Sequence, residues 1–288
     1  MPWLDLPEFK ESIEIASSAS GLDLTTFGTI SDADTIRDTA IAQPLIVSAS
    51  LASFAALKAA GLGSFAGVAG HSVGEVAAAA IAGVFDESTA MRLVTKRGAE
   101  MADAAAISQS SMAAVLGGDR DEVVDYLKKM ELSPANFNGA GQIVAAGSAD
   151  KIAELVANPL AGTRVIPLQV AGAFHTSFME PAVAELANFA SSIEAGQPKV
   201  KLWTNKDGSQ VSAGQEYLKL LVSQVSNPVR WDLCMESMMA AGVTAIIELS
   251  PAGTLAGLAK RGMPGVETLA LKTPDQLDAA IELAKNHG

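Results

Sequence analysis

With 288 residues, of which 49% are hydrophobic and 18% charged, the chain is long enough to bury a large core and too apolar to be disordered. Its net charge of −12 argues against nucleic acid as a partner, because phosphate contacts need clustered Lys and Arg. No secretory signal opens the chain, and the longest apolar run, 76–85, is about half a bilayer span. The single cysteine, Cys234, permits no internal disulfide, so a reducing cytoplasm is the expected compartment. Because the apolar run is too short to span a bilayer, we also expect a protein that binds no membrane.

The first 60 residues predict helices. Segment 6–26 is amphipathic, and Ser31 begins a second capped segment. Segment 39–60 is long and nearly uncharged, which predicts a helix buried on most faces. Its one bulky polar residue, Gln43, has two interpretations: it bonds the start of this helix, or it supports a site formed elsewhere.

Residues 66–75 read Ala-Gly-Val-Ala-Gly-His-Ser-Val-Gly-Glu and contain the pattern Gly70-x-Ser72-x-Gly74. This is the pattern of a nucleophile elbow, in which a strand turns sharply into a helix and exposes a serine. We expect both glycines to be needed, because a β-carbon at either position would clash with the strand or the helix. The apolar residues before the motif and the Ala-rich residues after it supply that strand and helix, so Ser72 is the predicted nucleophile.

After a helix over 87–105, whose basic side carries Arg92, Lys96 and Arg97, the pattern of elements changes. Strands are expected at 111–116, 135–138, 142–146 and 164–170, and helices at 119–130 and 149–157. The order β-α-β-β-α-β is that of a ferredoxin-like unit. We therefore assign 108–170 to an inserted ferredoxin-like subdomain and expect a ligand cleft between it and the main body.

The remaining chain alternates helices with strands expected at 200–204, 243–248 and 266–271. Such alternation predicts parallel strands covered by helices on both faces. The predicted fold class is therefore α/β. Residues 1–107 and 171–288 form an α/β-hydrolase-like parallel-sheet core, and 108–170 is its insertion.

A serine nucleophile needs a base within hydrogen-bond reach, and the chain has three histidines. His287 is the penultimate residue, and His71 adjoins Ser72 on the strand side with its side chain pointing away from the serine. His175 remains, in a loop that follows a predicted strand. No acidic residue stands beside a strand end between Ser72 and His175, which disfavours an esterase or lipase. A backbone carbonyl is expected to orient the imidazole instead.

Several motifs in this order give the chain a strong resemblance to one family over nearly its whole length. It resembles the malonyl-CoA:acyl carrier protein transacylases, in particular the actinobacterial form. The motifs are Ala42-Gln43-Pro44, Gly70 to Glu75, Arg97-Gly98, Asn136 to Val144, Gly172 to His175, Asn227 to Trp231, and Glu248 through Pro251 to Lys260-Arg261.

The resemblance implies a two-step acyl transfer. Ser72 would take the malonyl group from coenzyme A, with His175 as general base and then acid, and would pass it to the phosphopantetheine thiol of the carrier protein. Arg97 would pair with the malonyl carboxylate and so exclude acetyl. The N–H of Val73 would stabilise the oxyanion, and the carbonyl that orients His175 would be that of Arg230.

The same resemblance places three more residues at the substrate: Asn138 near the acyl pocket, His71 in the elbow motif, and Phe174, typical of the malonyl-type loop. It implies no bound cofactor or metal. Malonyl-CoA is the substrate, and the carrier protein of fatty acid or polyketide synthesis is the partner. We expect a monomer.

One departure from the family is expected to matter. Family members begin with a strand and a Pro-Gly-Gln-Gly loop that supplies a second oxyanion donor, whereas Met1-Pro2-Trp3 matches the stretch after that loop. Loss of one such donor typically costs about 10²–10³ in rate. Two alternatives therefore stay open: a thioesterase or hydrolase that uses the same serine, and a truncated form with impaired activity.

Overall fold

The N-terminal part of the chain is helical. The computed structural model describes residues 2–287; Met1 and Gly288, the outer limits of the predicted core, lie outside it. After a 3₁₀ turn, η1 (Pro2–Asp5), come α1 (Pro7–Ser20), α2 (Leu24–Thr29), α3 (Ala33–Arg37) and α4 (Thr39–Ala59). The side chains of Asp23, Asp32 and Asp38 cap the last three helices by accepting hydrogen bonds from backbone N–H groups.

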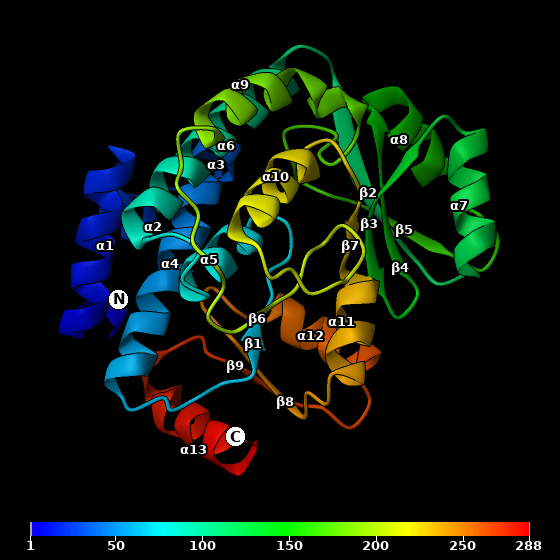
Figure 1. Cartoon of the computed structure of the whole chain (residues 1–288). Helices are drawn as coiled ribbons and strands as arrows, with labels where there is room; N and C mark the ends of the chain where they lie inside the picture. The colour runs from blue at the N-terminus through cyan, green and yellow to red at the C-terminus, as the bar shows by residue number, and fades with distance from the viewer. Residues whose placement is uncertain (1, 288) are drawn as a thin grey trace.

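Helix α4 is the buried helix that its composition predicts. By length and apolar character it could cross a membrane, but half of its apolar window is buried inside the protein. It packs against α1 on one side and against α6 (Glu87–Ala106) on another (Figure 1). We therefore regard α4 as a core helix of a globular protein.

The main body contains short parallel strand pairs. β1 (Gly67–Val68) pairs with β6 (Lys201–Leu202), and β8 (Ala245–Glu248) pairs with β9 (Glu267–Ala270). The parallel direction agrees with the prediction, but the expected single sheet is split into two two-stranded sheets. β6 is shorter than expected: the next residue, Trp203, still donates its backbone N–H to the Val68 carbonyl at 3.3 Å and forms an isolated antiparallel bridge with Gln210.

Residues 110–167 follow the predicted order β-α-β-β-α-β. The elements are β2 (Ser110–Leu116), α7 (Arg120–Lys129), β3 (Ser133–Gly139), β4 (Gln142–Ser148), α8 (Ala149–Ala157) and β5 (Arg164–Pro167). The strands lie in the order β5-β2-β4-β3 with each neighbour antiparallel, which is the ferredoxin-like arrangement. A fifth strand that the sequence did not predict, β7 (Val229–Arg230), joins this sheet parallel to β3.

The two faces of this sheet are both apolar. One face packs against α7 and α8, which lie on the outer side of the subdomain in Figure 1. The other face carries Met112, Val144 and Ala146 and packs against Ala173, Phe174 and Phe178 of the main body. The segment that carries His175 is thus held between the inserted sheet and the rest of the chain.

The remaining helices belong to the main body. They are α5 (Gly74–Ile81), α6, η2 (Ser177–Met179), α9 (Glu180–Ala190), α10 (Gly214–Gln224), α11 (Trp231–Ala240), α12 (Thr254–Gly262), η3 (Pro274–Gln276) and α13 (Leu277–His287). α5 follows β1 directly, as the nucleophile-elbow prediction requires.

Candidate active site

The elbow has the geometry that its motif predicts. Ser72 lies between β1 and α5 with φ 51°, a left-handed conformation that L-residues other than glycine rarely adopt. A β-carbon on Gly70 would stand 2.0 Å from the carbonyl carbon of Gly74, so glycine is required at position 70. A β-carbon on Gly74 would meet no atom within 4 Å, so the expected clash at position 74 is wrong.

Asn205, in the turn after β6, holds the backbone of the elbow. Its Oδ1 accepts a hydrogen bond from the Ser72 N–H at 2.7 Å, and its Nδ2 donates to the Gly70 carbonyl at 2.8 Å. Its own backbone N–H donates to Oε1 of Glu75 at 2.7 Å. Asn205 is fully buried, so these bonds satisfy groups that water does not reach. The three bonds fix the strained turn at Gly70, Ser72 and Glu75.

The structure brings Ser72 and His175 together. The Oγ of Ser72 lies 2.7 Å from Nε2 of His175, although 103 residues separate them in the chain. His175 is 4% exposed and also has a positive φ, 62°, so both members of the pair sit in uncommon backbone conformations. Its position just before η2 puts it at the junction of the main body and the subdomain, where the sequence placed it.

The C-terminal end of α10 orients His175. The Nδ1 of the imidazole bonds to the Gln224 carbonyl at 2.8 Å, and the His175 backbone N–H donates to the Val225 carbonyl at 3.2 Å. Carbonyls at this end of a helix have no partner inside it and carry the negative end of its dipole. With Nδ1–H donating to the Gln224 carbonyl, Nε2 is left to accept a proton from Ser72.

The expectation that Arg230 supplies this carbonyl is wrong. Arg230 lies in β7, where it pairs with Phe137 of β3. Its backbone N–H donates to the Asn205 carbonyl at 2.7 Å. Its guanidinium binds Asp232 through two nitrogens, at 2.9 and 2.7 Å, and covers the Phe137 ring. Strand pairing thus directs Arg230 toward the subdomain sheet, while the nearby end of α10 reaches the imidazole.

Burial and the nearby Arg97 charge lower the pKa of His175 from 6.5 to about 3. The imidazole is therefore neutral over the physiological range. A neutral imidazole that touches a serine hydroxyl can accept its proton, which is the first requirement of serine nucleophilic chemistry.

Arg97 projects from α6 into the same site. Gly98 allows α6 to approach α4 closely, because a β-carbon there would lie 2.9 Å from the Thr39 carbonyl oxygen. This approach places Arg97 beside Gln43, whose Oε1 accepts a hydrogen bond from Nη1. Gln43 also donates from Nε2 to Oγ1 of Thr39, the first residue of α4, at 3.1 Å, so the structure bears out both interpretations of Gln43.

The other end of the guanidinium reaches the nucleophile. Nη2 of Arg97 donates to Oε1 of Gln224 at 2.8 Å and lies 3.4 Å from Oγ of Ser72. Arg97 is 2% exposed, and its Nε has no hydrogen-bond partner among residues 2–287. Burial lowers its pKa to about 10, so the side chain is still positively charged at neutral pH. A buried cation beside the serine suits an acyl group that ends in a carboxylate.

Glu75 provides a buried carboxyl group behind the elbow. Its Oε1 accepts from the Asn205 N–H, and its Oε2 accepts from Nε2 of Gln224. Burial raises the pKa of Glu75 from 4.5 to about 7, against the opposing effect of hydrogen bonds from the Asn205 N–H, Tyr217 and Thr204 and of the Arg97 charge. One glutamine side chain thus separates the Glu75 carboxyl group from the Arg97 guanidinium.

Val73 occupies the position expected for an oxyanion donor. It is the residue before the first turn of α5, where backbone N–H groups point outward and favour negative charge. In the part of the chain that the structure describes, its N–H bonds to no acceptor. This N–H is therefore available to a ligand.

The three other predicted substrate residues line the junction. Nε2 of His71 bonds to Oδ1 of Asn138 at 2.8 Å, and the His71 ring packs edge-on against Trp231. Asn138 comes from β3, so this bond joins the elbow to the subdomain. Phe174 packs on both the main core and the inner face of the subdomain sheet. The structure places His71 and Asn138 together at the elbow and Phe174 next to His175, and the contact of all three with substrate stays a prediction.

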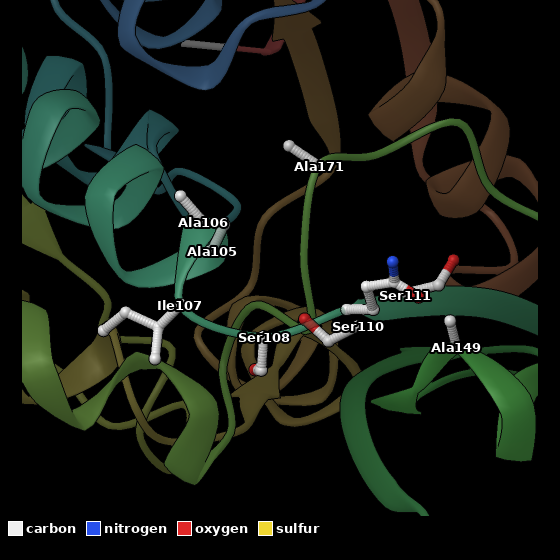
Figure 2. A pocket seen from close by; sticks show the side chains of 9 residues that line it. Ala105, Ala106, Ile107, Ser108, Ser110, Ser111, Ala149 and Ala171 are labelled. Carbon is white, nitrogen blue, oxygen red and sulfur yellow. The ribbon is translucent and has the colours of Figure 1, made fainter.

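A hollow of about 530 Å³ lies where the chain enters and leaves the subdomain. Figure 2 shows Ile107 and Ser108 on the segment that leaves α6, Ser110 on β2, and Ala171 on the returning segment. The returning segment is fixed by Ser110, whose Oγ accepts from the Ala173 N–H at 3.0 Å. This is the junction where the sequence predicts a ligand cleft; ligand binding there stays a prediction.

Sequence reasoning missed Glu75, Asn205 and Gln224 as parts of this site. Glu75 follows the elbow motif directly, and Asn205 comes just after a predicted strand, so each carried a positional signal. Gln224 ends a helix with no distinguishing motif, and only the folded chain shows its contacts.

Comparisons with known proteins agree with this geometry. The chain matches the acyl transferase domain family over residues 8–275. It is 47% identical to the malonyl CoA-acyl carrier protein transacylase of Mycobacterium tuberculosis H37Rv, covering 98% of this chain and 94% of that protein. The Escherichia coli K12 protein of the same name is 33% identical, covering 96% of this chain and 92% of that protein.

Solved structures give the same result. A crystal structure of MCAT from Mycobacterium tuberculosis superposes with a TM-score of 0.93 at 48% identity, covering 98% of this chain and 93% of that one. A malonyl-transacylase in complex with its type II PKS acyl-carrier protein superposes with a TM-score of 0.92 at 30% identity, covering 96% and 92%.

Proposed function

Since the chain belongs to the acyl transferase domain family, among the malonyl-CoA:acyl carrier protein transacylases, we propose that it transfers malonyl from coenzyme A to the phosphopantetheine thiol of an acyl carrier protein. One observation carries the mechanism: Ser72 Oγ lies 2.7 Å from Nε2 of a neutral imidazole whose Nδ1 is held by a backbone carbonyl. The enzyme is an acyltransferase that serves fatty acid or polyketide synthesis.

In the first half-reaction, Nε2 of His175 takes the proton of the Ser72 hydroxyl while Oγ attacks the thioester carbonyl of malonyl-CoA. The tetrahedral intermediate then breaks its carbon–sulfur bond. Coenzyme A leaves as the thiol with the proton that His175 returns, and malonyl remains on Ser72 as an ester. The Val73 N–H stabilises the negative oxygen of the intermediate.

The second half-reaction runs the same steps toward the carrier protein. His175 takes the proton of the phosphopantetheine thiol, and the sulfur attacks the malonyl ester. The ester bond breaks and Ser72 Oγ recovers the proton from His175. These steps use protein groups, the thioester and the carrier thiol, so the proposal requires no bound cofactor or metal.

Arg97 selects the acyl group. Its buried guanidinium lies beside Ser72 Oγ and pairs with the distal carboxylate of malonyl. An acetyl group has no carboxylate and leaves this buried charge unpaired, which is costly. His71, Asn138 and Phe174 complete the acyl pocket around the elbow.

The partner is a carrier protein that carries its phosphopantetheine arm, and the reaction takes place in the cytoplasm. The buried free thiol of Cys234, whose pKa is raised to about 12 mainly by burial, suits a reducing compartment.

Incubation with malonyl-CoA and a carrier protein, followed by intact mass spectrometry of the carrier, tests the proposed function. Wild-type enzyme should add one malonyl group to the carrier that bears the arm and none to the carrier that lacks it. Release of free malonate with no malonylated carrier would indicate a hydrolase and would overturn the proposal.

A further inference from the structure

The last residue of α10, Gln224, contacts four residues of the proposed site: Ser72, Glu75, Arg97 and His175. Its carbonyl bonds to Nδ1 of His175, and its side-chain Oε1 accepts from Arg97 at 2.8 Å. Its Nε2 donates to Glu75 and lies 3.2 Å from the Ser72 carbonyl oxygen. The side chain and the carbonyl thus contact different partners, so a substitution can change the first and preserve the second.

Chemistry determines which way the Gln224 amide points. A guanidinium only donates hydrogen bonds, so Oε1 must face Arg97, and Nε2 of the same amide then faces Glu75. A primary amide satisfies both neighbours without adding charge. A carboxylate at this position would pair with Arg97 and repel Glu75, and an apolar side chain would leave both groups without a partner.

The contacts around Arg97 keep its charge available. Within residues 2–287 the guanidinium makes no ion pair within 4.0 Å; it is held by the neutral oxygens of Gln43 and Gln224. Its buried counter-charge, Glu75, stands one amide away. A direct ion pair would instead compete with any carboxylate that the substrate brings.

We propose that the Gln224 side chain is a positioning residue for acyl-group selection: it holds Arg97 toward Ser72 and links it to Glu75 without neutralising it. This inference rests on the proposed malonyl transfer. It assigns to the Gln224 side chain a task separate from the orientation of His175 by the carbonyl of the same residue.

The test uses Gln224→Met, which keeps the side-chain length and the backbone carbonyl but removes the hydrogen bonds of the side-chain amide, including those to Arg97 and Glu75. We expect kcat/KM for malonyl-CoA to fall about 10- to 100-fold, mainly through KM, because a hydrogen bond to a charged group is lost. The preference for malonyl-CoA over acetyl-CoA should fall by a similar factor. Reaction of Ser72 with a sulfonyl fluoride, which needs His175 but no carboxylate recognition, should keep its wild-type rate.

Two further variants complete the experiment. Gln224→Asn is one methylene shorter and cannot reach both Arg97 and Glu75, so it should reproduce the loss of selectivity even if Gln224→Met fails to fold. Gln215→Met is the matched control, because Gln215 lies on the same helix and, in the part of the chain that the structure describes, its side chain donates only to the Ile193 carbonyl, at 3.1 Å. It should leave the acyl preference unchanged.

Two results would overturn the inference. One is a full malonyl preference in folded Gln224→Met or Gln224→Asn. The other is an equal loss of sulfonyl fluoride reactivity and malonyl transfer, which would indicate general damage to the Ser72–His175 pair. Failure of the proposed function would look different, because wild-type enzyme itself would then not malonylate the carrier.

Discussion

The Oδ1 of Asn205 lies 2.7 Å from the backbone nitrogen of Ser72, 133 residues away in the chain. The turn after β6 therefore fixes the backbone of the nucleophile through this hydrogen bond. We expect Asn205→Ala to lower the free energy of unfolding by about 2–4 kcal/mol, because it leaves the Ser72 N–H and the Gly70 carbonyl buried without partners. Urea unfolding measures this.

The Asn205 prediction also has a kinetic part. The rate of acyl-enzyme formation should fall in Asn205→Ala, since Ser72 is no longer fixed in its strained conformation. Asn227→Ala is the control, because Asn227 is exposed and its side-chain amide, among the described residues, bonds only to neighbouring oxygens of Ser223 and Ser226. Equal effects of the two substitutions would contradict a specific role for Asn205.

The two glycines of the elbow should respond differently to substitution. Gly70→Ala would force a β-carbon to within about 2 Å of the Gly74 backbone, so we expect loss of the folded elbow and of activity. Gly74→Ala meets no atom within 4 Å and lies in the first turn of α5, where alanine favours the helix. Thermal unfolding should show a large loss for the first and little change for the second.

Arg97→Ala should invert the acyl preference. The loss of a buried charged contact typically costs about 3–5 kcal/mol, so kcat/KM for malonyl-CoA should fall by about 10²–10³ while acetyl transfer rises. Arg97→Lys should recover little, because an ammonium group cannot form the same paired hydrogen bonds. Steady-state kinetics with both thioesters checks this, and an unchanged preference in Arg97→Ala would remove Arg97 from acyl selection.

The lowered pKa of His175 predicts how stability depends on pH. Between pH 6.5 and about 3 the unfolded chain binds a proton at this histidine and the folded chain does not. The contribution of His175 to the free energy of unfolding therefore rises with pH in that window. Glu75 has the opposite effect, because the folded chain holds a proton on it between pH 4.5 and about 7 and the unfolded chain does not. The contribution of Glu75 to the free energy of unfolding therefore falls as pH rises.

Comparison of wild type with His175→Ala separates the two groups, because Glu75 is present in both proteins. The difference in their free energies of unfolding, wild type minus variant, should increase from pH 4.5 to 6.5 and then level off. Urea unfolding at several pH values measures it. A difference that does not change with pH would contradict a lowered His175 pKa.

Local patterns were enough to predict the elbow and the inserted subdomain. Gly70-x-Ser72-x-Gly74 is contiguous, and the subdomain strands are marked by apolar runs between helices. His175 could be found by elimination, since the chain contains only three histidines.

Contacts between distant segments could not be predicted in this way. Asn205 and Gln224 are polar residues whose role depends on burial against the elbow, and no periodic pattern in the sequence indicates that burial. The family motif places the carbonyl that holds His175 at Arg230, whereas the end of α10 supplies it. β7 is too short, at two residues, for any alternating pattern to indicate it.

The proposed mechanism requires Ser72 to carry the acyl group. Mass spectrometry of the enzyme after incubation with malonyl-CoA alone measures this. Wild type should gain one malonyl group, located to the peptide that contains Ser72, and Ser72→Ala should gain none. A malonyl group that persists on Ser72→Ala would contradict the role of Ser72 as the nucleophile.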